Sequence, residues 1–399
     1  MPWRTNNVMD LRLEFVFRTL QPGANFRALC RETGISRKTG YKWQQRFLAG
    51  GLGGLTDAPR RPRSSPSQVP ESVVCELVRL KQAHRSWGPR KIRELYRRLY
   101  GAAPCLSSCK RILTKAGLVQ IRRRRVHRST DRLTRAIVAQ EPNDVWTVDF
   151  KGWWRTGSGQ RCEPLTVRDD YSRYILGARA MQTNTGELVR HEFERLFDRY
   201  GLPRVIRSDN GAPFACGHGL LGLTRLSAWW LVLGIDLDRI RPGHPEENGG
   251  HERMHRDIAY EIEGLVSGGL TEQQAALDVW RESFNEERPH KALKMKTPAQ
   301  VYKPSERAFT GTPDEIAYKP GLLIRRVNHR GIIKIHAHHL FISESLCGWQ
   351  VGLDPVGPDE MDLWFAELYL GKIDLTRAGF LAAYGRQEPC SPPCGRSLP

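Results

Sequence analysis

The spacing of apolar residues divides the chain into a helical N-terminal third and a later part with strand-like patterns. In the first third, helical periodicity predicts short helices over residues 11–20, 25–33 and 36–47. Gly34 closes the second of these helices and Ser36 caps the third, because glycine ends helices and serine begins them. Two helices joined by a short glycine turn are the layout of a helix-turn-helix unit.

A second helical unit is predicted beyond a linker rich in Gly, Pro, Arg and Ser. Its helices are expected over residues 71–84, 88–100 and 107–116, and we interpret it as a second helix-turn-helix. The expected boundaries are 8–50 for the first unit, 51–69 for the linker, 70–120 for the second unit and 121–142 for a basic linker. Two such units in tandem suit a long DNA site.

From residue 143 the apolar pattern changes to that of strands alternating with helices. Three strands, a helix, a strand, a second helix and a short strand are predicted in that order, over residues 145–150, 165–167, 174–180, 186–200, 205–208, 226–233 and 235–240. A further helix follows Asn248, which is a good N-cap, and Met254, Ile258 and Ile262 would form its buried stripe. This order is that of an RNase H-like α/β domain, which we place at residues 143–305.

Two further elements are expected after the helix that follows Asn248. Thr271 and Gln274 form a capping box that would open a helix running to Glu286 and packing on the core domain. Beyond it the pattern becomes β-rich, and we place a small β domain at residues 316–376 and a tail at 377–399.

The positive charge is concentrated in the N-terminal third. The whole chain has a net charge of +19, yet residues 1–140 hold 30 Lys and Arg against 8 Asp and Glu, and the rest of the chain is slightly acidic. Such clustering of basic residues is typical of a nucleic-acid-binding module. The residues expected to contact DNA are Arg37, Lys38, Lys42 and Gln44 at the start of the third helix, Lys110 and Arg111 in the second unit, and the run Arg122, Arg123, Arg124 and Arg125, which would follow a phosphate backbone.

Cysteine spacing and hydropathy indicate the cellular compartment in which the protein is expected. Nine cysteines fall at irregular positions, and the C-x-x-x-C pairs at Cys105 and Cys390 lack a matching second pair, so free thiols in a reducing cytoplasm are expected. The N-terminus has no apolar segment typical of a secretion signal. The longest apolar run, near residues 228–235, is too short to span a bilayer.

Three acids mark the candidate chemistry. Asp149 ends the first predicted strand, Asp209 follows the fourth, and Glu252 lies one turn into the helix after Asn248, on the face away from the core. The two strands are neighbours in an RNase H-like sheet, so the three carboxylates should converge on one edge. Such an oxygen-rich site suits two Mg²⁺ ions that stabilise the attacking and leaving oxygens of a phosphoryl displacement. Asp169 and Asp170 are interpreted as structural turn residues.

The same helix supports a competing hypothesis. His251, Glu252 and His255 form a literal H-E-x-x-H, which on a helix of a zinc metalloprotease supplies two imidazole ligands and a general base. That motif recurs by chance, and no third ligand is marked downstream. A protease would also not explain Asp149 and Asp209 at the ends of their strands, or the basic N-terminal third.

Several motifs together resemble the integrase-like transposases of insertion sequences, which carry a DDE catalytic core. The resemblance covers about residues 5–375 in consistent order. Its motifs are GISRKTGYKW in the first unit, Asp149 in its strand, the Ser-Asp-Asn-Gly turn at Asp209, the N-G-x-x-E-R-x-H-R helix at Glu252, RPHKAL at 288–293 and TPAQVY at 297–302. By position, Asp149, Asp209 and Glu252 match the family's metal-binding triad. The β-rich segment resembles the small SH3-like barrel that follows some integrase-type cores.

The resemblance implies a DNA transposase that binds its element's terminal inverted repeats, cleaves the ends and joins 3′ hydroxyls to target DNA. It implies Mg²⁺, with Mn²⁺ as a substitute, two ions per site, and a homo-oligomer on double-stranded DNA at the nucleoid of a bacterial cytoplasm. His255 and Arg256 are then expected to line the DNA path.

One departure leaves alternatives open, since 42 residues separate Asp209 from Glu252, more than is usual in the family. Glu246 is nearer the usual spacing but follows a proline in a loop, so Glu252 is preferred. We expect the surplus in the Gly-rich stretch 215–224. A catalytically inactive or domesticated DNA-binding protein remains the alternative.

Overall fold

The computed structural model of the protein describes residues 7–57, 68–119, 137–241 and 245–383, except the side chains of residues 245 and 246. The chain forms two compact units, residues 1–68 and 69–399. Arg122, Arg123, Arg124 and Arg125, which were predicted to follow a phosphate backbone, lie outside the described residues.

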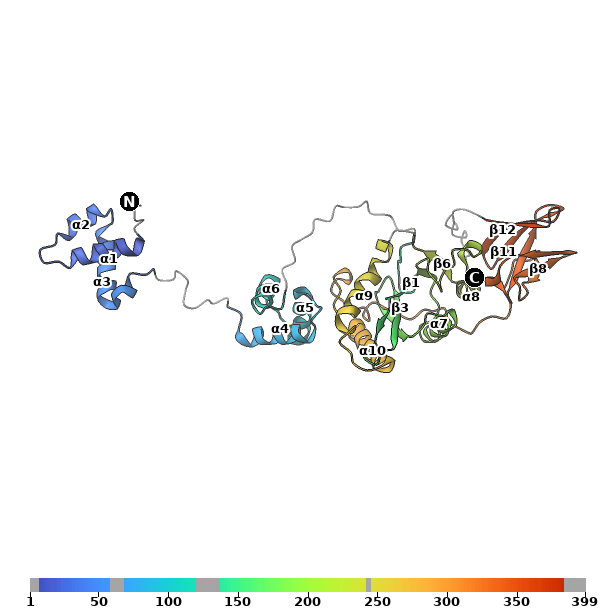
Figure 1. Ribbon diagram of the computed structural model, residues 1–399, viewed down its shortest axis with the longest axis horizontal. Coiled ribbons are helices and arrows are strands. Elements are labelled where there is room, and N and C mark those ends of the chain that lie inside the picture. The colour runs from blue at the N-terminus through green and yellow to red at the C-terminus, as the bar shows by residue number, and fades with distance from the viewer. Residues whose placement is uncertain (1–6, 58–67, 120–136, 242–244, 384–399) are drawn as a thin grey trace, which may run out of the picture. The chain divides into compact units, whose positions relative to one another are not determined.

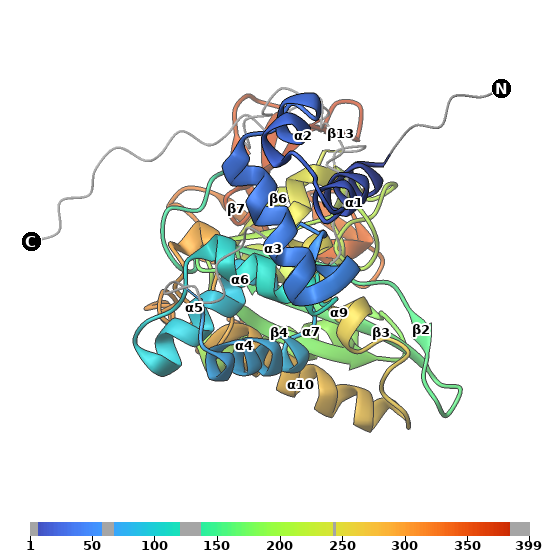
Figure 2. The same ribbon diagram turned by 90° about the vertical axis from the view of Figure 1, so that its left-hand side faces the viewer.

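The first unit contains three helices, α1 (Val8–Thr19), α2 (Phe26–Glu32) and α3 (Arg37–Gly54) (Figures 1 and 2). The Ser36 side chain accepts a hydrogen bond from the Thr39 backbone, as its predicted role as N-cap of α3 requires. Trp43 is buried with Phe15, Val16 and Cys30 in a small core, and this packing holds α3 against the other two helices. The predicted helix-turn-helix arrangement is confirmed, with α3 extending past its predicted end.

The second helical unit contains α4 (Glu71–Ala83), α5 (Pro89–Tyr100) and α6 (Leu106–Lys115). Each helix contributes apolar side chains to one cluster that includes Leu77, Trp87, Ile92 and Leu113. The three predicted helices are therefore present, and their shared core explains why the short helices are stable, since most helical stability in proteins comes from packing an apolar face.

The α/β domain is built on a sheet with strand order β2-β3-β1-β5-β6, and β4 also pairs with β3. The strands are β1 (Val145–Phe150), β2 (Trp154–Arg155), β3 (Arg161–Asp169), β4 (Ile175–Met181), β5 (Val205–Ser208) and β6 (Asp236–Arg239). β1 is antiparallel to β3 and parallel to β5. This arrangement is the RNase H-like sheet that the order of the predicted elements indicated.

Helices cover both faces of the sheet. On one face, α7 (Gly186–Tyr200) and α8 (Arg225–Val232) pack through Phe193, Phe197, Trp229 and Trp230 (Figure 1). On the other face lie α9 (Gly249–Glu261) and α10 (Leu270–Glu286), and α10 runs along the outer strands β3 and β4 (Figure 2). The predicted stripe on α9 is confirmed, because Met254, Ile258 and Ile262 are buried.

The predicted capping box at the start of α10 is wrong. The Glu272 carboxylate, rather than Thr271, binds the first turn, where it accepts a hydrogen bond from the Gly269 backbone at 2.7 Å. Gln274 instead bonds both backbone groups of the edge strand β4, accepting from Ala180 N at 2.9 Å and donating to Ala178 O at 3.1 Å. The packing of α10 on the core, which was also predicted, is confirmed by these contacts.

Residues 323–382 of the C-terminal part form β strands, apart from turns and a short 3-10 helix, Glu344–Leu346. Five antiparallel strands form one sheet in the order β13-β12-β11-β10-β7, and β8 (Ile332–Ile335) and β9 (His338–Phe341) form a separate hairpin. The sheet strands are β7 (Leu323–Arg326), β10 (Gln350–Pro355), β11 (Glu360–Phe365), β12 (Leu368–Asp374) and β13 (Gly379–Ala382). The described strand pairings do not close into a barrel, so the predicted SH3-like barrel is not confirmed.

The stretch 215–224, where the extra residues between Asp209 and Glu252 are expected, packs against the C-terminal strands. The stretch expected to hold the surplus forms a loop with a short 3-10 helix, Leu220–Gly222, and Leu223 is buried. Leu223 and Ala228 belong to the same apolar cluster as Leu340, Leu353 and other side chains of the C-terminal strands. This stretch and the start of α8 therefore supply part of the surface on which the C-terminal sheet packs.

Replacing Leu223 with alanine should test that packing. Because Leu223 is 2% exposed, its truncation should lower the free energy of unfolding by about 2–5 kcal/mol. The measurement is urea unfolding followed by tryptophan fluorescence. Leu265→Ala is the control, since Leu265 is 66% exposed and its loss should change stability by less than about 0.5 kcal/mol. Equal effects of the two substitutions would contradict the packing role.

Two further observations concern the described residues as a whole. None of their helices combines the length and the apolar character needed to cross a membrane. The seven cysteines among them, including Cys105, Cys109 and Cys216, are free thiols.

Candidate active site

Asp149 lies near the end of β1, the strand at the centre of the sheet. Residues before it on β1, from Val145 to Val148, are buried, while the Asp149 side chain is 26% exposed. On the neighbouring strand β3 its register partner is Thr166. The strand therefore delivers one carboxylate to the sheet edge from a rigid, buried support.

Asp209 comes immediately after β5, which is parallel to β1. Because parallel strands end at the same edge of a sheet, this brings Asp209 to the side of Asp149. The Gly211 backbone donates a hydrogen bond to Asp209 Oδ1 at 3.1 Å and so orients the carboxylate. A Cβ atom at Gly211 would lie 3.0 Å from Asp209 Oδ2, tighter than ordinary contacts, so glycine suits this turn.

Glu252 lies in the first turn of α9 and is exposed, as predicted. The pKa of Asp149 is raised to about 7. Burial is the largest cause, followed by the negative charge of Asp209, and the charge of Glu252 also contributes. Like-charged neighbours disfavour ionisation in this way. The charges of the other two acids singled out in the sequence therefore both act on Asp149.

Asn248 contributes a contact that the sequence pattern did not predict. It occupies the N-cap position of α9, but its side chain makes no capping hydrogen bond. Instead the Asn248 Nδ2 donates to Asp149 Oδ2 at 3.2 Å, and its Oδ1 has no hydrogen-bond partner among the described residues. Asn248 is buried, so it fixes the orientation of the Asp149 carboxylate. Its place in the N-G-x-x-E motif was the available signal.

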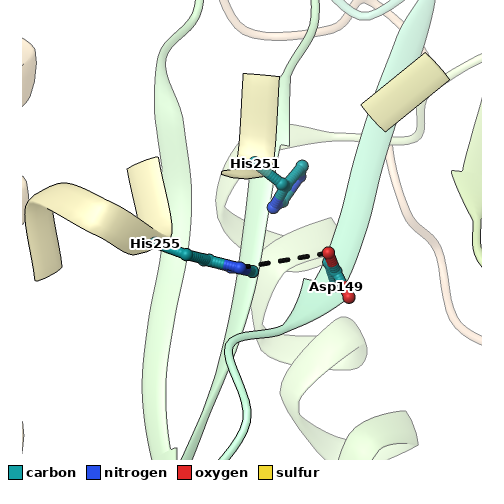
Figure 3. Close-up of side chains that lie close together, drawn as sticks. All are labelled: Asp149, His251 and His255. Atoms are coloured by element: carbon teal, nitrogen blue, oxygen red, sulfur yellow. Dashed lines mark ion pairs between the residues drawn. The ribbon is translucent and has the colours of Figure 1, made fainter. Parts of the chain in front are cut away.

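Two histidines of α9, His251 and His255, lie close to Asp149 (Figure 3). His251 is fully buried, and its Nε2 and Nδ1 lie 2.7 Å from Thr147 Oγ1 and 3.1 Å from Thr166 Oγ1. His255 Nε2 lies 2.8 Å from Thr166 Oγ1, and its Nδ1 lies 4.0 Å from Asp149 Oδ2. The threonines were missed, although a threonine within an apolar, buried strand was the signal that could have indicated them.

The electrostatic setting keeps both histidines neutral. Burial, followed by the positive charge of Arg168, lowers the pKa of His251 well below its ordinary value. Burial, with Lys151 and Arg168 nearby, lowers the pKa of His255 to about 4. Ligand atoms of Asp149, His251 and His255 lie within 4.8 Å of one another, so these residues form a group that could hold a metal ion.

That group does not favour the zinc-protease arrangement. Such a site requires both histidines of H-E-x-x-H as ligands of one ion. Both ring nitrogens of His251 are already bonded to threonine hydroxyls beneath the helix. Of the two histidines, only His255 has a ring nitrogen near the Asp149 carboxylate. This nitrogen, Nδ1, is not hydrogen-bonded to Asp149.

Arg168 supports α9 from below. It lies on β3, its side chain is 8% exposed, and it pairs with Asp170 at 2.7 Å. A Cβ atom at Gly250 would lie 2.2 Å from the Arg168 guanidinium. Glycine at this position therefore lets the first turn of α9 lie close to Arg168 on β3.

Comparison with known proteins agrees with this geometry. Two families described as integrase core domains match residues 139–245 and 233–298. A helix-turn-helix domain matches residues 11–63, and a homeodomain-like domain matches residues 39–113. A 39.2 kDa protein of insertion element IS476 from Xanthomonas euvesicatoria is 28% identical over 254 residues, which cover 62% of this chain and 70% of the relative. These matches show an integrase core domain within residues 139–298 and helix-turn-helix-type domains within residues 11–113.

The chain is also similar to a second insertion-element protein and to solved integrase structures. A 31.7 kDa protein of insertion element IS407 from Burkholderia multivorans is 26% identical over 265 residues, which cover 66% of this chain and 91% of the relative. Among solved structures, the HTLV-2 integrase catalytic core domain in complex with magnesium is 15% identical and covers 42% of this chain and 100% of that chain. Its TM-score of 0.31 is too low to support the assignment by itself.

The residues predicted to contact DNA have different surroundings. Arg37, Lys38 and Lys42 are exposed on α3, and Lys110 and Arg111 are exposed on α6. Gln44 is turned toward α1, where it donates to Thr19 Oγ1 at 3.4 Å. Within the integrase core, Arg256 is exposed, whereas His255 is 14% exposed and faces Thr166 and Asp149 rather than solvent.

The acids outside the triad have structural roles that fit their predicted interpretation. Asp169 is fully buried, and its carboxylate accepts hydrogen bonds from Asn143 N at 2.8 Å and from the backbone and hydroxyl of Ser172. Asp170 pairs with Arg168 and Arg207. Both acids therefore brace turns of the integrase core.

The raised pKa of Asp149 predicts a pH dependence of stability. A carboxyl group whose folded-state pKa is raised contributes stability that is full below its unfolded-state pKa and is lost as pH rises through the folded-state value. In metal-free protein, the free energy of unfolding should therefore fall between about pH 4 and about pH 7. Asp149→Asn should flatten that part of the profile, measured by urea unfolding in chelator, and an unchanged profile would contradict the raised pKa.

Proposed function

We propose that the protein is a transposase that binds the terminal inverted repeats of its own insertion sequence, cleaves the DNA ends and joins the 3′ hydroxyls to target DNA. The observation that carries this proposal is the coupling of Asp149 to Asp209 and Glu252, which come from two adjacent strands and a helix. Together with the integrase-core and helix-turn-helix similarities, this supports a polynucleotidyl transferase.

The donor set fits divalent metal ions. Burial, and then the neighbouring Asp209 and Glu252 carboxylates, raise the pKa of Asp149, and a divalent cation bound beside it would offset that effect. Oxygen donors of this type suit Mg²⁺, with Mn²⁺ as a substitute. Asp149, Asp209 and Glu252 would hold two ions, which supply activation of the nucleophile and stabilisation of the leaving oxygen in an in-line displacement.

The chain's own residues position this chemistry. Asn248 and the Gly211 backbone orient Asp149 and Asp209 through single hydrogen bonds. The apolar stripe of α9 anchors the helix on the sheet, so Glu252 projects from a rigid element. Arg256, exposed one turn beyond Glu252, is available to a DNA phosphate.

DNA binding would begin in the N-terminal third. Arg37, Lys38 and Lys42 lie at the start of α3, where the recognition helix of a helix-turn-helix meets base edges. Lys110 and Arg111 would serve the second unit, and Arg122 to Arg125 would contact the backbone. The two ends of an element must be held together, so the active form would be a homo-oligomer on DNA at the bacterial nucleoid.

The alternative function is a catalytically inactive or domesticated DNA-binding protein. It shares the N-terminal third and differs only in whether the acids act. The coupling of all three acids favours the active transposase. The zinc-metalloprotease alternative is disfavoured, because the hydrogen bonds of His251 occupy a nitrogen that a zinc ion would need.

The test uses purified full-length protein and duplexes carrying the DNA that flanks the gene. Site-specific nicks at the 3′ ends, followed by joining of those ends to a second duplex in Mg²⁺, are the expected products. A duplex with a scrambled end sequence is the control. Specific binding without nicking in Mg²⁺ or Mn²⁺ would favour the inactive DNA-binding protein instead.

A further inference from the structure

His255 faces the carboxylate that the transposase chemistry would use. His255 lies one turn after Glu252 on α9. Its Nδ1 is 4.0 Å from Asp149 Oδ2 (Figure 3). A hydrogen bond requires a shorter separation, and one between an imidazolium and a carboxylate would measure about 2.7–2.9 Å. No proton is therefore shared between these two atoms.

The hydrogen bonds around Thr166 assign the protonated nitrogen of each ring. The Thr166 hydroxyl has one proton, which it donates to the Asp149 backbone carbonyl at 2.9 Å. The two ring nitrogens that contact the same hydroxyl, His251 Nδ1 and His255 Nε2, must then donate to it. A neutral imidazole has only one N–H, so the remaining nitrogen of His255 carries a lone pair.

That lone pair points at a carboxylate oxygen. His255 Nδ1 and Asp149 Oδ2 are both electron-pair donors, and Asn248 Nδ2 is the hydrogen-bond donor that the structure places on that oxygen. Two lone pairs that face one another, here those of His255 Nδ1 and Asp149 Oδ2, favour a cation between them. His251 cannot take this role, because its second nitrogen is bonded to Thr147 Oγ1 at 2.7 Å.

We propose that His255 Nδ1 is a nitrogen ligand, together with Asp149, of a divalent metal ion at the carboxylate site. The proposal rests on the proposed transposase function, and it changes the donor set from oxygen alone to oxygen plus one imidazole. Metal–ligand distances of about 2.0–2.1 Å let one ion span donors up to about 4.2 Å apart, which accommodates the 4.0 Å separation.

The supporting contacts match those of a metal-binding histidine. Such a residue usually donates its other ring N–H to an oxygen that fixes its tautomer and orientation. Thr166 Oγ1 has that place for His255, at 2.8 Å from Nε2. Thr166 also bonds the backbone of Asp149, so one side chain fixes the position of both ligands.

The test is pulsed electron paramagnetic resonance of Mn²⁺ bound to the full-length protein without DNA. Directly coordinated imidazole couples its ¹⁴N nucleus to the manganese spin, whereas a histidine that only supports the fold does not. Wild type should show this coupling, and His255→Asn should lose it. His191→Asn is the matched control, because His191 is exposed on α7 and its substitution should leave the signal unchanged.

A second measurement uses metal preference. Imidazole favours later transition metals over Mg²⁺, so His255→Asn should lower Co²⁺ affinity about tenfold and Mg²⁺ affinity less than about threefold. Mn²⁺ binding to wild type with no ¹⁴N coupling, or coupling that survives in His255→Asn, would overturn the inference and leave the proposed function standing. No binding of Mn²⁺ or Co²⁺ to wild type would overturn both the inference and the metal site of the proposed function.

Discussion

Asp149→Asn should reduce DNA cleavage and joining by about a thousandfold or more, while binding of the element's ends persists. The substitution would remove a proposed metal ligand, and metal stabilisation of charge in phosphoryl transfer amounts to several kcal/mol. The fold should be preserved, because the Asn side chain has the same shape and Asn248 can still donate to its oxygen. The measurement is strand transfer of labelled oligonucleotides beside a binding assay with the same DNA.

The matched control is Asp198→Asn, the same chemical change at an exposed position of α7. It should retain wild-type cleavage and joining. Normal strand transfer by Asp149→Asn would show that the acid cluster is not the catalytic centre. Loss of both activity and DNA binding would indicate unfolding, and circular dichroism of the variant would reveal it.

DNA binding by the full chain should weaken by about a thousandfold or more between 50 and 200 mM salt, if about six or more phosphates are neutralised. The physical reason is the charge asymmetry, because 30 Lys and Arg lie in residues 1–140 against 8 Asp and Glu. Each neutralised phosphate releases counterions and contributes about −0.9 to the slope of log affinity against log salt. Fluorescence anisotropy at several salt concentrations measures that slope.

Two variants separate base contacts from phosphate contacts. Arg37→Ala should reduce the preference for the element's ends over random DNA by about 1–3 kcal/mol, since Arg37 lies at the start of α3. Arg122→Ala should weaken binding to all sequences alike and lower the magnitude of the salt slope by about 1. Lys372→Ala, on the exposed side of the C-terminal sheet, is the control. A salt slope near zero would show that the basic third does not bind DNA.

Local patterns determined most of the elements in the chain. The pattern of apolar residues predicted β1, α7 and β5 at the bounds that the structure shows, because each of these elements contributes buried apolar side chains to the same core. Ser36 acts as an N-cap as predicted, since capping depends only on neighbours three residues away. The charge asymmetry and the positions of the three acids are likewise properties of the linear chain.

Long-range partners account for the errors. Thr271 and Gln274 satisfy a local capping pattern, yet Gln274 bonds the edge of β4, 94 residues or more away in sequence. An exposed strand edge offers unpaired backbone groups that compete for a polar side chain, and only the packed structure shows which partner is nearer. Strand pairing in the C-terminal part also depends on distant registers, so the open five-stranded sheet could not be distinguished from a barrel.

By itself, the sequence determined the helical and strand elements, the basic N-terminal third and the identity of the acids, because these depend on periodicity, composition and motif. Only the tertiary structure decided which side chains act on those acids. Asn248 turns from its helix end to Asp149, 99 residues away, and His255 turns from the expected DNA path toward Asp149 and Thr166. Such contacts form when α9 packs on β1 and β3, and no local pattern encodes the distance between residues of different elements.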